Sequence, residues 1–282
     1  MSHVATAFND LRIGVRVSLA FVLPLAGLLW FSIATVVGEY RLMTRLGGLQ
    51  TVAELGTRYS AAIHELQKER GSSALYLGPK GTQFGDRLEG QRRETDASLS
   101  KLKSFLAAFP FKEYDPQLHQ IATTADASVN ALASKRHQVT AQELTVLQGA
   151  GYYTETIAHM IDVIKQMMVL SPNGRVSNAI AAYVGLIEAK ERMGLERATG
   201  SGGFAAQKFA PALYQRFIAL IAEQAVFLNH FQTFATPAQT AFLRETVSGQ
   251  TVEEVKRMEA LAVGSLEAGN TGGVEAPGGS TP

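Results

Sequence analysis

The stretch HELQKERGSSALYL, His64–Leu77, combines a helical packing pattern with a charge that does not fit it. Counted in steps of three and four residues, one face of this helix carries Ile63, Leu66, Arg70, Ser73 and Leu77. Apolar and small side chains on one face predict packing against a neighbouring element. Arg70 adds a permanently charged guanidinium to that face, and a buried charge without a partner is strongly destabilising. The stretch therefore predicts a packed helix with an anion beside Arg70.

A second stretch repeats this combination. The stripe that starts at Val176 and passes through Ile180, Ile187 and Gly194 ends at Arg197. Small residues surround both arginines, and they include Gly71, Ser72, Ser73, Ala74, Gly194, Ala198, Gly200 and Ser201. If the two stripes face each other, the two guanidinium groups bind one small planar oxyanion through paired, charge-assisted hydrogen bonds.

An internal carboxylate is the alternative partner for these arginines. The candidates close by in the sequence pattern are Glu65, Glu69, Glu191 and Glu196. A single arginine on a packing face is more often in a structural ion pair than in a ligand site. Two arginines with small neighbours favour a shared cavity, and spacing alone leaves both interpretations open.

The chain outside its two ends is expected to be helical throughout. Sustained polar/apolar alternation and tight hairpin turns are missing from the sequence, so the predicted fold class is all-α. The first expected helix ends at a break at Gly78–Gly81, the second covers about 84–108, and the third starts at Pro116 with Asp115 as its cap. The fourth runs from a capping box at Thr140–Glu143 to about 170, and the fifth covers about 175–199 and ends at a break at Gly200–Gly203. The last three cover about 206–235, 237–247 and 252–266, and Thr251 caps the final one. Eight amphipathic helices joined by short loops predict two up-down four-helix bundles.

The N-terminal part predicts a membrane anchor. Residues 17–38 carry no charge and are numerous enough to span a bilayer, which takes about 20 residues. Arg12 and Arg16 before this run predict a cytoplasmic N-terminus, and a cleaved signal peptide is the rival interpretation. The expected order is a cytoplasmic segment 1–16, a transmembrane helix 17–38, a periplasmic sensor domain 39–267 and a Gly/Pro-rich linker 268–282 that leads to a second span.

Composition excludes several functions. The 26 basic and 25 acidic residues give no basic excess, so no nucleic-acid partner is expected. The chain has no cysteine, and its six histidines do not follow a metal-binding spacing. The sequence therefore predicts no catalytic residue, no metal, no cofactor and no enzymatic activity.

Two segments carry a family resemblance. ELQKERGSSALYL, followed by FGDRLEGQRRETDASLSKLKSFL, resembles the start of the NIT domain, the nitrate- and nitrite-sensing domain of bacterial receptors. EAKERMGLERATGSGGF is similar to the second conserved segment of that family, and the resemblance extends over about Gly56 to Val263. It implies two four-helix bundles that bind nitrate or nitrite between Arg70 and Arg197. Supporting residues would be Ser73, Tyr76, Tyr183, Gly194 and Ser201.

The resemblance also implies an expected function. It is an inner-membrane receptor, such as a chemoreceptor or a sensor histidine kinase, that acts as a homodimer and passes its signal to a cytoplasmic module beyond the chain end. Nitrate would draw the helix of Arg197 toward that of Arg70 and move the first helix. Two alternatives stay open: a helical receptor for another small anion or organic acid, and a membrane-anchored interaction protein without a ligand.

Overall fold

The computed structural model describes residues 13–171 and 173–271. The chain divides into two compact units, Met1–Ala53 and Glu54–Pro282, and the boundary falls within helix α2 (Ile13–Leu77). All described residues of the first unit belong to α2. Among the helices that the structure describes, none is both long enough and apolar enough to cross a membrane.

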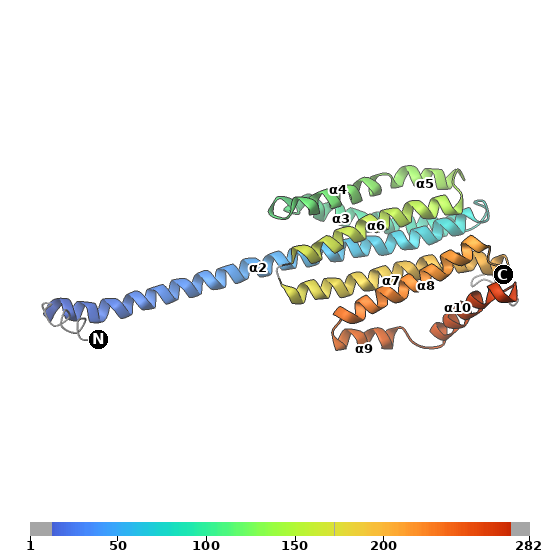
Figure 1. The fold of residues 1–282 in the computed structure, drawn as a ribbon. Helices are drawn as coiled ribbons and strands as arrows, with labels where there is room; N and C mark the ends of the chain where they lie inside the picture. The colour runs from blue at the N-terminus through green and yellow to red at the C-terminus, as the bar shows by residue number, and fades with distance from the viewer. Residues whose placement is uncertain (1–12, 172, 272–282) are drawn as a thin grey trace. The chain divides into compact units, whose positions relative to one another are not determined.

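The second unit is a set of packed helices (Figure 1). After the end of α2 it contains α3 (Gly85–Ala108), the 3₁₀-helix η1 (Phe111–Glu113), α4 (Pro116–Asn130), α5 (Leu132–Thr140), α6 (Val146–Leu170), α7 (Gly174–Ala205), α8 (Pro211–Phe234), α9 (Pro237–Thr246) and α10 (Gln250–Ala268). No strand occurs among the described residues, so the predicted all-α class is confirmed for them.

Helix α2 contributes residues to both groups of helices in the second unit. Figure 1 shows α3 to α6 on one side of this part of α2 and α7 to α10 on the other. On the first side, the Gln91 amide of α3 donates a hydrogen bond to the Glu65 carboxylate at 2.7 Å. On the second side, the Gln67 amide donates to the Glu191 carboxylate of α7 at 2.9 Å. The face of α2 around Gln67 therefore meets α7.

The helix starts agree only partly with the sequence prediction. Asp115 caps α4 by accepting a hydrogen bond from the Gln117 amide at 2.7 Å, as predicted. The predicted capping box at Thr140–Glu143 is wrong, because Thr140 ends α5 and its hydroxyl donates to the Arg136 carbonyl within that helix. The real box lies at Thr145, which precedes α6. Helix α10 likewise starts at Gln250, one residue before the predicted cap.

The predicted break at Gly200–Gly203 is also wrong, because α7 continues through it to Ala205. These glycines serve close packing. A Cβ atom at Gly200 would lie 3.1 Å from the Phe217 ring of α8, and one at Gly203 would lie 2.3 Å from the Phe209 ring. Glycine lowers helix propensity, but here its missing side chain gives two aromatic rings their place against α7.

A buried ion pair joins α2 to α5. The side chain of Glu69 is fully buried and accepts hydrogen bonds from Nε of Arg136 at 2.7 Å and Nη2 at 2.8 Å. The Tyr153 hydroxyl of α6 donates to the same carboxylate at 2.8 Å. Arg136 also binds Asp96 of α3 at 2.6 Å. Three helices therefore meet at the Glu69 carboxylate, and Arg136 connects α3 to them through Asp96.

Candidate functional site

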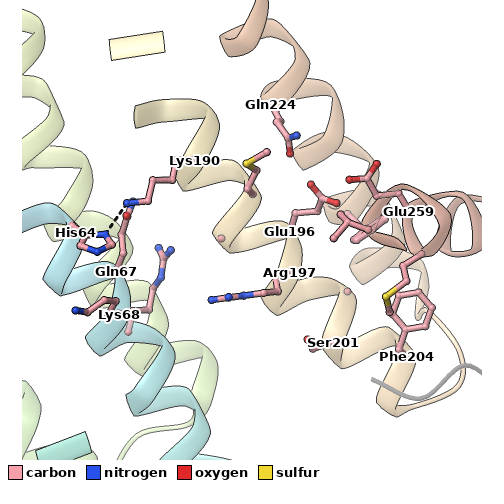
Figure 2. Close-up of a pocket in the computed structure, with 17 residues that line it drawn as sticks. His64, Gln67, Lys68, Lys190, Glu196, Arg197, Ser201, Phe204, Gln224 and Glu259 are labelled. Carbon is pink, nitrogen blue, oxygen red and sulfur yellow. Dashed lines mark hydrogen bonds between the residues drawn. The ribbon is translucent and has the colours of Figure 1, made fainter. Parts of the chain in front are cut away.

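A pocket of about 490 Å³ lies in the second unit, between α2, α7, α8 and α10 (Figure 2). Helix α2 contributes polar side chains to it, and α7 lines it from Lys190 to Ser201. Phe204, Phe217 and Met258 supply apolar surface. Pockets with mostly apolar walls and a few polar groups are the usual form of a small-molecule site.

Arg70 lies in this pocket and is paired within the protein. Its side chain is 8% exposed, and its Nη1 and Nη2 atoms donate to the two carboxylate oxygens of Glu191, the second at 3.1 Å. Nη1 also donates to the Thr154 hydroxyl of α6 at 2.9 Å. Glu191 is itself only 3% exposed. Among the carboxylates that the sequence offered as internal partners, Glu191 is the one that binds Arg70.

Arg197 lines the same pocket from α7 and is not paired. In Figure 2 its side chain extends from α7 toward α2. Arg197 is exposed and forms no hydrogen bond or ion pair with any residue in the described ranges. The structure thus brings Arg70, Arg197, Gly194 and Ser201 to one pocket.

Gly194 makes room for the guanidinium of Arg70. A Cβ atom at this position would lie 3.1 Å from Nη2 of Arg70, which is tighter than an ordinary contact. Gly194 was predicted as a small neighbour of Arg197 on its own helix, but it lies against Arg70 of the facing helix α2. Its role is steric.

Three of the predicted supporting residues lie outside the pocket. The Ser73 hydroxyl donates to that of Tyr153 at 3.3 Å, away from the α7 face of α2. Tyr76 packs against the cluster of Leu77, Leu88 and Val139. The Tyr183 hydroxyl is hydrogen-bonded to that of Ser60. A position on a helical stripe does not specify which of two packed faces a tyrosine reaches.

Lys190 and His64 also line the pocket and were not singled out as site residues from the sequence. The Lys190 ammonium lies 2.9 Å from Nδ1 of His64 (Figure 2). Burial lowers the pKa of Lys190, and burial together with the Lys190 charge lowers the pKa of His64. The signal was present, because Lys190 lies on the stripe of Arg197 and His64 opens the stretch of Arg70. The end of the pocket between α2 and α7 therefore carries the positive charges of Lys68, Arg70, Lys190 and Arg197.

The opposite side of the pocket holds a pair of acids. Figure 2 shows Glu196 of α7 and Glu259 of α10 near each other, with Gln224 of α8 beside them. Burial, followed by the charge and hydrogen bond of Glu259, raises the pKa of Glu196 to about 8. Two adjacent carboxyl groups share one proton more readily than they carry two charges. The pocket thus has a cationic end and an acidic end.

This acid pair predicts a stability that falls with rising pH. Unfolding returns Glu196 from a pKa of about 8 to its ordinary value of 4.5, so between these values the folded state holds a proton that the unfolded state lacks. Raising the pH through this window therefore destabilises the fold. Glu196→Gln is expected to be more stable than the wild type by about 1 kcal/mol at pH 8, because solvent screening reduces the full linkage effect.

Thermal unfolding followed by circular dichroism checks this prediction at about pH 5.5, inside the window, and at about pH 8, its upper end. Glu253→Gln on α10 is the control, since Glu253 is 71% exposed and forms a surface ion pair with Lys256. An equal pH slope in the wild type and in Glu196→Gln would contradict the shared proton.

The structure shows an all-helical domain with a pocket of small-molecule size that has a cationic end and an acidic end. The family model described as nitrate and nitrite sensing, NIT, matches residues 61–279. The chain therefore belongs to the NIT family, which confirms the resemblance seen in the sequence.

Two relatives extend this assignment. The nitrate regulatory protein of Klebsiella oxytoca is 26% identical over 227 residues, which cover 79% of this chain and 57% of the relative. The structure of the NasR transcription antiterminator matches with a TM-score of 0.72 at 24% identity, over 84% of this chain and 63% of that one. The chain thus spans about three fifths of the length of these relatives.

The predicted membrane receptor is contradicted by these findings. The relatives are described as a nitrate regulatory protein and a transcription antiterminator, and none of the helices described here is able to span a membrane. The expected periplasmic location and membrane partner are therefore wrong. The expectation of no nucleic-acid partner conflicts with a relative that acts in transcription. The end segments 1–16 and 268–282 lie largely outside the described residues.

Proposed function

We propose that the second unit binds nitrate or nitrite at the cationic end of the pocket. The observation that carries this proposal is the guanidinium of Arg197, which has no partner among the described residues and extends toward the α2 wall that holds Arg70. Lys190 lies on the same side and adds positive charge, while the lowered pKa of His64 keeps that imidazole neutral at pH 7. An anion at this position offsets charges that otherwise repel one another.

The chemistry of the site suits a small planar monoanion. A guanidinium group offers parallel N–H donors that match two oxygens of one plane, as in nitrate, nitrite or a carboxylate. Entry into the pocket removes water from the ligand, which favours an anion that is readily dehydrated. Nitrate and nitrite combine both properties, and the family assignment favours them over other planar anions.

The proposed role is that of a sensor within a longer regulatory protein. Its two groups of helices, α3 to α6 and α7 to α10, lie on either side of α2 and also meet where α6 packs on α7, and the proposed ligand site lies where α7 meets α2. Binding changes the relative stability of two packings of α7 on α2, and only a difference in affinity for the two packings shifts their populations. By analogy with the two relatives, the output is the control of gene expression. The site binds and releases its ligand without chemical change.

Arg197→Ala tests the proposal. We expect isothermal titration of the full chain to show nitrate and nitrite binding that weakens at least about tenfold in this variant, because one guanidinium supplies at least about 1.4 kcal/mol. The melting temperature should stay close to that of the wild type, because Arg197 has no partner among the described residues. The control is Arg175→Ala, which removes an exposed arginine from the first turn of the same helix, outside the pocket.

Titration with other anions separates the alternatives. Heat from acetate or another carboxylate, with none from nitrate or nitrite, would assign the site to an organic acid. If no anion binds or raises the melting temperature, Arg70 serves only its structural ion pair, and the sensor function is refuted.

A further inference from the structure

The fork of Arg70 already holds an anion that belongs to the protein. Glu191 occupies both terminal nitrogens of Arg70, and both side chains are buried. The amide of Gln67 donates to the same carboxylate at 2.9 Å and keeps it in place. A ligand that uses the Arg70 fork therefore has to take the position of this carboxylate.

The carboxylate of Glu191 has the shape of the proposed ligand. Its two oxygens lie in one plane around a trigonal carbon and receive one donor each from the guanidinium. Nitrate and nitrite present two oxygens around a trigonal nitrogen in the same way. The Glu191 carboxylate and the ligand offer Arg70 the same pair of acceptors, so they compete for its guanidinium.

We propose that Glu191 is an internal competitor of the ligand, and that nitrate or nitrite binds by displacing its carboxylate from Arg70. This inference rests on the proposed function of the pocket. In this exchange Glu191 sets the affinity of the site, because each binding event has to break its ion pair. It also sets selectivity, because an anion that cannot bridge both nitrogens replaces the carboxylate poorly.

The pocket contains what the exchange requires. Lys190 lies close enough for the Glu191 charge to act on its pKa, in the direction opposite to burial, so the displaced carboxylate keeps a cation nearby. The charge balance also improves on binding. Before binding, Glu191 neutralises Arg70, and Arg197 has no acidic partner among the described residues. After binding, the charges of the two arginines are balanced by Glu191 and the ligand.

The exchange would also transmit the signal. The Arg70–Glu191 pair is a direct link between α2 and α7, and it joins two residues 121 positions apart. When the ligand takes Arg70, that link opens and is replaced by one through the ligand to Arg197. The α7 helix then settles in a different position against α2, with the ligand as part of the interface.

Glu191→Gln tests the competition, because glutamine keeps the shape and removes the charge. We expect nitrate to bind about tenfold more tightly to this variant, and acetate to gain at least as much. Glu188→Gln is the matched control on the same helix, because it removes a buried carboxylate that pairs with Lys165 and Arg192 outside the pocket, and its expected change is less than about threefold. Glu191→Asp, whose shorter side chain retracts from the fork, is expected to give the same direction of change and serves if the glutamine variant does not fold.

A second arm separates displacement from simple charge repulsion. In an Arg70→Gln background the gain from Glu191→Gln should vanish, since there is no fork to release; a gain that persists there overturns displacement. Equal or weaker nitrate binding by folded Glu191→Gln also overturns it, while the wild type still binds and the proposed function stands. If neither the wild type nor Glu191→Gln binds nitrate or nitrite, the proposed function itself fails.

Discussion

Arg136→Ala is expected to lower the free energy of unfolding by about 3–5 kcal/mol, the usual cost of leaving one partner of a buried ion pair uncompensated. Its partner Glu69 has no exposed side-chain surface and would keep only the hydrogen bond from Tyr153. The change also removes the contacts of Arg136 with Asp96 and with the Arg92 carbonyl. Urea unfolding at neutral pH measures the loss.

Asp96→Asn is the matched control for this variant. It removes the other acidic partner of Arg136, but Asp96 is 61% exposed, so the expected loss is below about 1 kcal/mol. Adding Glu69→Gln to Arg136→Ala should recover part of the stability, because it removes the stranded charge. Equal losses for Arg136→Ala and Asp96→Asn would show that burial of Glu69 does not control the stability of this network.

Gly185→Ala is expected to cost about 2–3 kcal/mol through overpacking of α7 against α8. A Cβ atom at Gly185 would lie 2.7 Å from the backbone nitrogen of Phe231 and 2.9 Å from the carbonyl oxygen of Phe227. Backbone atoms cannot rotate out of the way as a side chain does, so the two helices have to separate. Differential scanning calorimetry measures the loss.

Gly202→Ala on the same helix is the control for this effect. Its Cβ atom would meet only the end of the Leu213 side chain, at 3.8 Å, so the gain in helix propensity of about 0.5–1 kcal/mol should dominate. Helix α7 also carries Glu191 and Arg197, so Gly185→Ala should weaken nitrate binding while Gly202→Ala should not. If Gly185→Ala were as stable as the wild type, α7 and α8 could move apart without lowering the free energy of unfolding, which would contradict the prediction.

The helices of this protein could be predicted from the sequence because their periodicity is a local property. The errors arose where the role of a residue depends on a distant partner. Gly200 and Gly203 looked like a break, although Phe217 and Phe209 make glycine necessary inside α7. Thr140 and Thr145 both fit a capping pattern, and only the structure shows which of them precedes a helix.

The candidate site shows the same limit. A charged residue on an apolar stripe singled out Arg70 and Arg197 as candidates, and the structure buries Arg70 but leaves Arg197 exposed. The choice of Glu191 among four carboxylates was out of reach, because it depends on how α7 faces α2. The sequence also placed three residues at the site that lie outside the pocket, namely Ser73, Tyr76 and Tyr183. Helices α2 and α7 pack on more than one face, and spacing does not say which partner each face meets.

The neighbouring residues Glu69 and Arg70 have a consequence for how this domain can move. Consecutive side chains on an α-helix point about 100° apart, and here one is bound to α5 and the other to α7. A turn of α2 about its own axis would strain both attachments together, including the fully buried one at Glu69. Freeing Arg70 alone leaves the other attachment intact. Within the second unit we therefore expect α2 to act as the fixed axis, and α7, together with the tightly packed α8, to be the part that the proposed ligand would displace.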